Sequence, residues 1–376
     1  MKKLLAVVLA ACTAFALASC NNNAEKSYTS GNTEYVIGCT GPLTGDASSY
    51  GISVQKGATL AVDEINKNGG LNGVKFKFDM KDDKAAAADA ASGYDMLYEA
   101  GMQVSLGSVT SGSCASFASK AVKDNVFFIT PSASAANVIE SGKNAFRVCF
   151  GDPDQGVLAA NEINEKYETV GVIYDTSDPY SSGIYEAFKG EMEKLGKEYA
   201  VQTFDAENKK DFSTQVEALK DCDVIFLPFY YTEAGLVAKA CVAKGCDAVL
   251  FGCDGFDGID GQIDSSVTNL IRYITPFDVN STDATVADFV QAYKDAYSGE
   301  APDQFAADGY DAVYAIFNAM QKAGINDVTI SASDLCDKLI PAITADDFTY
   351  TGATGTMTWD ASGACNKIPT IIELQK

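Results

Sequence analysis

Segments with the spacing of strands alternate with segments with the spacing of helices along most of this chain. Val74, Phe76 and Phe78 alternate with charged residues, which is the two-residue period of a strand with one wetter face. Val54 and Ala58 recur at the spacing of one helix face. Because strands that alternate with helices pair in parallel and are covered on both faces, the expected fold class is α/β with parallel sheets.

The alternation stops at Gly151-Asp152-Pro153 and then restarts, so we expect two α/β domains. A length of 376 residues and an apolar fraction of 47% are enough for two cores. The expected strands lie near 35–40, 74–80, 103–106, 126–130, 170–174, 200–204, 224–227 and 248–251, and two more, near 356–359 and 368–373, are joined by a turn at 360–363. The main expected helices lie near 54–65, 85–100, 114–124, 154–166, 182–195, 284–297, 307–323 and 332–340.

The first twenty residues have the layout of a secretory signal. Two lysines precede an apolar run from Leu4 to Ala18, which is too short to span a bilayer. The run ends in Leu17-Ala18-Ser19-Cys20, which resembles the bacterial lipobox, where cleavage precedes the cysteine and the thiol receives lipid. We therefore expect a signal peptide at 1–19, lipidation at Cys20 and a flexible tether at 20–33, which together hold the protein on the extracytoplasmic face of a bacterial cell membrane. An ordinary signal with a chance cysteine, or an uncleaved anchor, is the alternative.

Charge and histidine content exclude several function classes. The net charge is −23 and no basic stripe is present, so the chain repels phosphate backbones and no nucleic-acid partner is expected. The chain has no histidine, which excludes Ser-His-Asp and Cys-His catalysis and histidine metal sites. Since no other nucleophile stands beside a base in the pattern, we expect no catalytic residue, no metal and no cofactor.

Eleven cysteines are present, and nine remain if Cys12 leaves with the signal and Cys20 carries lipid. An odd number cannot all pair in disulfides. Most of the nine stand in apolar contexts, so we expect buried and mostly reduced thiols. The spacing of Cys241, Cys246 and Cys253 matches no zinc pattern.

Small hydroxyl residues follow two predicted strands of the first half, in the loops Thr110-Ser111-Gly112-Ser113 and Ser132-Ala133-Ser134. Such residues commonly cap the following helix. Hydroxyls and backbone amides at helix N-termini also hold anions. A carboxylate is favoured over phosphate, because neither loop contains Lys, Arg or the glycine pattern of a phosphate loop.

Tyrosines and an acid follow the strands of the second half, in Asp178-Pro179-Tyr180, Phe229-Tyr230-Tyr231 and Cys253-Asp254-Gly255. An acid at such a place can hold a cation that tyrosines frame, although an exposed turn and core tyrosines would give the same pattern. Ligands of open parallel sheets bind beyond the carboxyl ends of the strands, so the two sets of loops together predict a site for a zwitterion. The acids at 254, 257, 260 and 264 lack the spacing of an EF-hand loop, which favours a solvated loop over a calcium site.

Several motifs together resemble those of the periplasmic leucine/isoleucine/valine-binding proteins. They are Gly41-Pro42-Leu43-Thr44-Gly45, Tyr50-Gly51, Asn68-Gly69-Gly70-Leu71-Asn72-Gly73, Ile129-Thr130-Pro131-Ser132-Ala133-Ser134 and Lys210-Asp211-Phe212-Ser213. The resemblance covers about residues 34–375. It implies a type I periplasmic-binding-protein fold, with two Rossmann-like lobes that have parallel central sheets and are joined by a three-crossing hinge. The implied division is 34–152 with 276–355 for lobe 1, and 153–275 with 356–376 for lobe 2.

The resemblance implies a monomeric substrate-binding lipoprotein of an ABC importer. Such a protein captures an amino acid, branched-chain or similar, by hinge closure and works with a membrane-embedded permease. A sensing receptor of the same fold, or a receptor for a related amine-bearing molecule or short peptide, is the alternative. A ligand-binding role follows for each residue that matches the family: Ser111 and Ser134 bind the α-carboxylate, Ser132 adds backbone groups, Tyr180 and Tyr230 (or Tyr231) cover the ligand from lobe 2, Asp254 binds the α-ammonium, and Tyr50 lines the side-chain pocket.

This sequence departs from the family pattern at three places. The family usually has Thr where Ser134 stands, and familiar branched-chain members have Glu where Asp254 stands. The disulfide of some members is not expected, because Asp82-Asp83-Lys84-Ala85 contains no cysteine.

Overall fold

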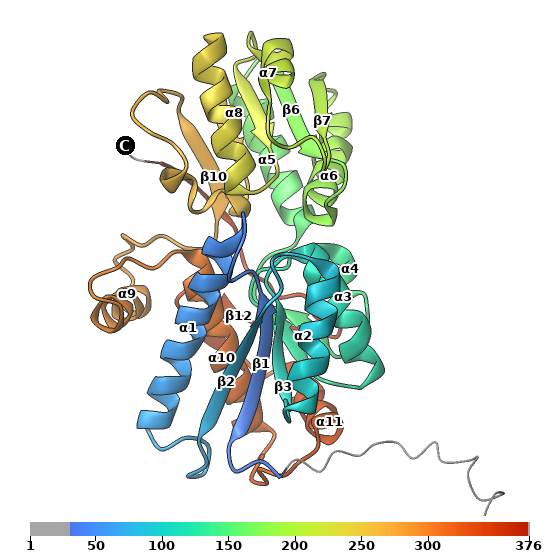
Figure 1. Ribbon diagram of the computed structural model, residues 1–376, viewed down its shortest axis with the longest axis vertical. Helices are drawn as coiled ribbons and strands as arrows, with labels where there is room; N and C mark the ends of the chain where they lie inside the picture. Colours follow the sequence, from blue (N-terminus) through green and yellow to red (C-terminus); the bar gives the residue numbers. More distant parts are fainter. Residues whose placement is uncertain (1–30, 375–376) are drawn as a thin grey trace, which may run out of the picture.

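The computed structural model describes residues 31–374, which form two lobes, each built around its own sheet (Figure 1). The predicted signal peptide at 1–19, Cys20 and most of the predicted tether lie outside the described residues. Among residues 31–374, no helix combines the length and the apolar character that a membrane span needs.

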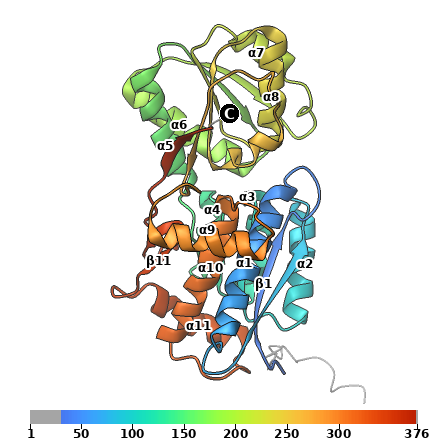
Figure 2. The ribbon, with the colours of Figure 1, turned by 90° about the vertical axis from the view of Figure 1, so that its left-hand side faces the viewer.

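Lobe 1 contains a five-stranded parallel sheet in the order β2-β1-β3-β4-β5. Its strands are β1 (Tyr35–Gly41), β2 (Phe76–Asp82), β3 (Val104–Ser108), β4 (Phe128–Thr130) and β5 (Ala145–Arg147). Its helices are α1 (Ser48–Lys67), α2 (Ala87–Glu99), α3 (Ser111–Lys123), α4 (Ala136–Ile139), α9 (Ala284–Ala296), α10 (Gln304–Lys322) and α11 (Ala332–Ile343). Every residue of β1 is buried, because α1 and α10 cover one face of the sheet and α2 and α3 the other (Figures 1 and 2).

Lobe 2 contains a six-stranded sheet in the order β13-β10-β9-β8-β6-β7. Its strands are β6 (Val170–Asp175), β7 (Ala200–Phe204), β8 (Val224–Leu227), β9 (Val249–Gly252), β10 (Ile271–Thr275) and β13 (Thr370–Glu373). Its helices are α5 (Asp152–Lys166), α6 (Pro179–Leu195), α7 (Ser213–Leu219) and α8 (Tyr231–Lys244), with short 3₁₀ turns η1 (Asp254–Phe256) and η2 (Ile259–Gly261). Along β8, Phe226 packs in the cluster on the α5 and α6 side, while Ile225 and Leu227 pack in the cluster on the α8 side.

The expected α/β class with parallel sheets is confirmed, with two antiparallel pairs, β10 with β13 and β11 with β12. The last two expected strands do not remain together. The first becomes β12 (Gly355–Met357), which pairs with β11 (Tyr350–Gly352), and the second becomes β13, which pairs antiparallel with β10. Trp359 follows β12 and donates its Nε1–H to the carbonyl of Arg147 in 2.7 Å, so this segment contacts lobe 1 before the chain reaches lobe 2.

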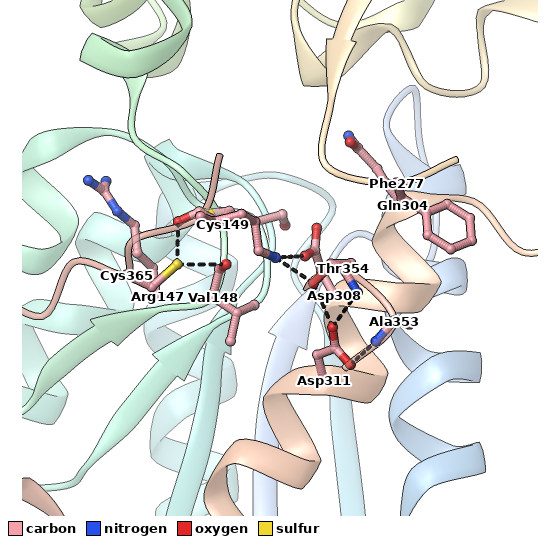
Figure 3. Close-up of polar contacts among 12 residues, drawn as sticks. Arg147, Val148, Cys149, Phe277, Gln304, Asp308, Asp311, Ala353, Thr354 and Cys365 are labelled. Atoms are coloured by element: carbon pink, nitrogen blue, oxygen red, sulfur yellow. Dashed lines mark hydrogen bonds and ion pairs between the residues drawn. The ribbon is translucent and has the colours of Figure 1, made fainter. Parts of the chain in front are cut away.

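The chain passes between the sheets three times: after β5, after β10 and between β12 and β13. Buried polar groups gather where these crossings lie side by side (Figure 3). Lys367 of the last crossing pairs with Asp308 of α10 at 2.7 Å and also donates to the Thr354 hydroxyl at 2.6 Å. Asp311 accepts hydrogen bonds from the main-chain N–H groups of Ala353 and Thr354. The last crossing is therefore fastened to α10 by charged and polar contacts within the protein.

Candidate functional site

The predicted site residues come from the ends of strands in both lobes. Ser111 begins α3 just after β3, and Ser132 follows β4. In lobe 2, Tyr180 follows β6, Tyr230 follows β8, and Asp254 begins η1 directly after β9. These are carboxyl ends of parallel strands, where open α/β sheets place their ligands.

A small cavity of about 10 Å³ lies between these loops. It is lined by Tyr50, Val109, Thr110, Ser111, Ser132, Tyr180, Tyr230, Asp254, Gly255 and Phe305. The structure thus brings six of the seven predicted ligand-binding residues to one space. The seventh, Ser134, is fully buried and does not line the cavity. Its carbonyl accepts hydrogen bonds from the Arg147 guanidinium at 2.6 Å and from the main-chain N–H of Asp152.

Asp254 is the charged group of this cavity, and its side chain is almost fully buried at 5% exposure. Burial raises the pKa of its carboxyl to about 6, and hydrogen bonds from Tyr180 and Gln155 oppose that rise. The Tyr180 hydroxyl donates to Asp254 Oδ1 at 2.6 Å and also accepts the main-chain N–H of Gly255 at 2.9 Å. No Lys or Arg within residues 31–374 forms an ion pair with Asp254. This carboxylate therefore has hydrogen bonds but no cation to balance its charge.

Hydroxyl groups of lobe 1 lie across the cavity from the second-lobe loops. The Ser111 hydroxyl accepts the main-chain N–H of Ala135 at 3.2 Å, which leaves its own proton available to a ligand. The Thr110 hydroxyl is buried and has no hydrogen-bond partner among the described residues. Ser132 instead donates its hydroxyl to the carbonyl of Val109 at 2.7 Å. Neither α3 nor α4 has a side-chain N-cap, so these hydroxyls do not serve as the helix caps that the sequence also allowed.

Tyr50 crosses from lobe 1 to lobe 2. Its hydroxyl donates to the carbonyl of Gly255 and accepts the main-chain N–H of Tyr231 at 3.1 Å. Its ring lies 4.2 Å from that of Phe305. Tyr231 itself does not line the cavity, whereas Tyr230 does and stacks on Tyr180 at 5.1 Å. The aromatic side of the cavity therefore contains groups from both lobes.

The start of α10 adds two residues that the sequence did not single out. Phe305 lines the cavity. Gln304 donates its side-chain N–H to the carbonyl of Asp254 at 2.7 Å and accepts the Thr275 hydroxyl at 2.8 Å. The main-chain N–H of Gln304 donates to Asp257 Oδ2 at 2.9 Å. Gln304 thus fixes the loop that carries Asp254, although no local motif marked it.

The four acids at 254, 257, 260 and 264 differ in how deeply they are buried. Asp254 is buried and Asp257 is half-buried, whereas Asp260 and Asp264 are exposed. The expected solvated loop therefore describes only the later part of this run. Within residues 31–374, no group of three metal-ligating side chains has the arrangement of a metal site. Asp178 caps α6 by accepting the main-chain N–H of Tyr180. It therefore has a structural role in a turn, which was the alternative to a cation-binding role.

Comparisons with known proteins agree with this geometry. The model of the family described as periplasmic binding protein matches residues 34–364. The Leu/Ile/Val-binding protein BraC3 of Rhizobium johnstonii is 30% identical over 335 residues, which cover 86% of this chain and 89% of that protein. The leucine-, isoleucine-, valine-, threonine- and alanine-binding protein of Pseudomonas aeruginosa is 29% identical, covering 87% of this chain and 86% of that one.

The fold is similar to a solved structure as well. The branched-chain amino acid transporter substrate-binding protein LivJ of Streptococcus pneumoniae, solved in complex with isoleucine, superposes with a TM-score of 0.79 at 29% identity. The superposition covers 91% of this chain and 96% of LivJ.

Proposed function

This chain belongs to the periplasmic binding protein family, a family of binding proteins and not of enzymes, and we propose that it captures a free α-amino acid between its two lobes. The single observation that carries the proposal is the buried Asp254 carboxylate, which has no cation partner among residues 31–374 and lies in a cavity with the Ser111 and Thr110 hydroxyls. An α-ammonium would balance the charge of Asp254. An α-carboxylate would accept hydrogen bonds from the hydroxyls and from the N-terminus of α3.

The class of amino acid is proposed from the cavity and from the relatives. Apart from Asp254 and the hydroxyls, aromatic and aliphatic side chains line much of the cavity, including Tyr50, Val109 and Phe305. The names of the relatives cite leucine, isoleucine and valine, so a branched-chain or similar amino acid is the proposed ligand.

The proposed setting is an ABC importer. We propose that lipid on Cys20 holds a monomeric receptor outside the membrane and that the closed, ligand-bound form delivers its amino acid to the permease. The lipobox-like Leu17-Ala18-Ser19-Cys20 and the transporter named for the LivJ relative support this setting. Ligand binding would shift the protein from an open to a closed form, because contacts to both lobes exist only when the lobes are together.

A thermal-shift panel of the twenty standard amino acids on residues 21–376 tests the proposal. Ligand that binds the folded protein at about 100 times its Kd stabilises it by about 2.7 kcal/mol, so the melting temperature should rise with branched-chain or similar amino acids. Urea and short peptides belong on the same plate. A shift with one of these alone would favour the alternative receptor, and no shift with any α-amino acid would contradict the proposed ligand class.

A further inference from the structure

Helix α8 ends in a Schellman motif whose two contacting positions are both cysteines. The main-chain N–H of Cys246 donates to the carbonyl of Cys241 at 2.9 Å. The main-chain N–H of Gly245 donates to the carbonyl of Val242 at 3.4 Å. Gly245 has φ +64°, the left-handed conformation that this motif requires. The motif characteristically brings the side chains at the positions of Cys241 and Cys246 into contact across the end of the helix.

The two thiols are close together in an otherwise apolar environment. Cys241 is fully buried, Cys246 is 3% exposed, and both belong to the cluster on the α8 side of the lobe 2 sheet. α8 begins beside the cleft at Tyr231, so these cysteines lie at its far end, roughly 20 Å away along a 14-residue helix.

Cys246 differs in acidity from the other described cysteines. The hydrogen bond from Cys241 lowers the pKa of the Cys246 thiol to about 7, with a further hydrogen bond from the main chain of Ala248. The pKa of Cys241 is raised, because Cys241 keeps the shared proton and is buried. Burial raises the pKa of the remaining described cysteines, which are Cys39, Cys114, Cys149, Cys222, Cys253, Cys336 and Cys365. The pair therefore combines a thiolate with a neighbouring thiol that can resolve an oxidised sulfur.

We propose that Cys241 and Cys246 are an oxidation site that closes into a disulfide when the protein meets hydrogen peroxide. All nine described cysteines are free thiols in this structure, so this is the reduced form. The Cys246 thiolate attacks one peroxide oxygen, the O–O bond breaks, and hydroxide leaves, which gives a sulfenic acid. The Cys241 sulfur then attacks the Cys246 sulfur, and the sulfenic oxygen leaves as water. Two thiols and one peroxide become one disulfide and two waters.

The small size of the oxidant matters for this site, because Cys246 is nearly covered.

Cys222 is the cysteine that competes with Cys241 as the disulfide partner of Cys246. It is half-buried and close enough for the charge of Cys246 to raise its pKa. The Schellman contact favours Cys241 over Cys222, since it joins Cys241 to Cys246 through a main-chain hydrogen bond.

Peptide mapping by mass spectrometry after brief peroxide treatment and thiol blocking tests the proposal on the full mature chain. The expected product lacks two hydrogen atoms and carries a Cys241–Cys246 crosslink, while the other cysteines are blocked as free thiols. Cys241→Ala removes both the resolving thiol and the neighbour that lowers the Cys246 pKa. In this variant Cys246 should oxidise more slowly than in the wild type, and the oxidised fraction should react with a sulfenic-acid probe instead of forming the crosslink. Cys222→Ala is the matched control and should form the same crosslink as the wild type.

Three results would overturn the assignment. A Cys222–Cys246 crosslink would show that Cys222, and not Cys241, is the partner. Oxidation of Cys246 no faster than that of Cys336 would show that Cys246 is not unusually reactive. Recovery of both Cys241 and Cys246 as unmodified thiols would show that the pair is not an oxidation site. The mapping of wild-type protein decides among these outcomes even if a variant does not fold. Because the site lies at the far end of α8, amino-acid affinity should be equal before and after oxidation, which separates this test from that of the proposed ligand.

Discussion

Asp257 and Asp303 come from different lobes, and both use the first amides of α10. Asp257 accepts the main-chain N–H of Gln304 at 2.9 Å, and Asp303 accepts that of Ala306 at 2.8 Å. Ser53 adds a hydrogen bond to Asp303 at 2.6 Å. Burial, followed by the neighbouring Asp303, raises the pKa of Asp257 to about 8, because two close carboxylates resist ionising together.

This pair predicts a pH dependence of stability. An unfolded Asp has a pKa near 3.9, so between about pH 4 and about pH 8 the folded pair holds a proton that the unfolded chain has lost. The free energy of unfolding therefore falls as pH rises through this window, by at most about 1.4 kcal/mol per pH unit for one proton, and levels off above it.

Asp257→Asn keeps an oxygen for the N–H of Gln304 and removes the repulsion, so it should flatten the decline. Urea unfolding at roughly pH 5 and roughly pH 8 measures the difference between variant and wild type. Asp288→Asn, an exposed residue of α9, is the control and should keep the wild-type slope. Equal slopes for wild type and Asp257→Asn would refute the shared proton.

At this scale, sequence predicts residue types better than it predicts long-range partners. Tyr180, Tyr230 and Asp254 were predicted, because each directly follows a strand that the periodicity reveals. Phe305 and Gln304 were missed, since they begin a helix about fifty residues after Asp254 and only tertiary packing brings them to the cleft. Which of these residues touch the ligand stays a prediction.

Among the elements, α10 connects the site to both lobes. It packs along α1 in lobe 1, and its first turn reaches the η1 loop and the end of β10 in lobe 2 (Figure 2). Further along the same helix, Asp308 holds Lys367 of the last crossing, beside Asp311 and Thr354 (Figure 3). One helix therefore contacts the ligand cavity, the second crossing and the third crossing.

Gln304→Ala should weaken ligand binding through this element. The variant leaves the buried carbonyl of Asp254 without its side-chain donor, and an unsatisfied buried group costs about 1–3 kcal/mol. If that cost falls on the closed form, calorimetry should report an affinity lower by roughly 5- to 150-fold. Gln321→Ala, an exposed position on the same helix, should bind as the wild type does. Wild-type affinity for Gln304→Ala would show that α10 does not stabilise the loop that carries Asp254.

Periodicity predicts most of the elements, because helices and buried strands leave regular apolar patterns. It missed β5, β10 and β11. β5 and β11 have only three residues each, and β10 contains a buried Arg272, whose charge predicts an exposed position. It also placed the last two strands together, since a turn between strands looks the same whether or not the strands pair. Their separation into different sheets depends on the crossing that Lys367 fastens to α10.

At the scale of the whole molecule, two lobes joined by three crossings enclose the cavity. In the proposed function, ligand binding biases the opening and closing of these lobes. The predicted lobe boundaries, including the one near residue 356, stay predictions. The acidic composition gives the protein a well-solvated surface, and the anchoring at Cys20 is a separate expectation that rests on the first twenty residues.

Cys20→Ser tests the anchoring. Without the thiol no lipid can be attached, so the protein should leave the membrane fraction, keep its ligand affinity and support little uptake. Fractionation of cells followed by binding measurements on the released protein checks each part. If the variant stays with the membrane, another feature holds the protein there.

The central claim is that the cleft recognises both charges of an α-amino acid, the ammonium through Asp254 and the carboxylate through the hydroxyls of lobe 1. Calorimetric titration with the amino acid that gives the largest thermal shift, with its deaminated acid and with its amide, tests this most directly. Since each charge-assisted hydrogen bond contributes about 1.5–3 kcal/mol, either analogue should bind at least roughly 10-fold more weakly. In Asp254→Asn the amino acid should lose its advantage over the deaminated acid. Equal affinity of the wild type for the amino acid and its deaminated form would contradict the account.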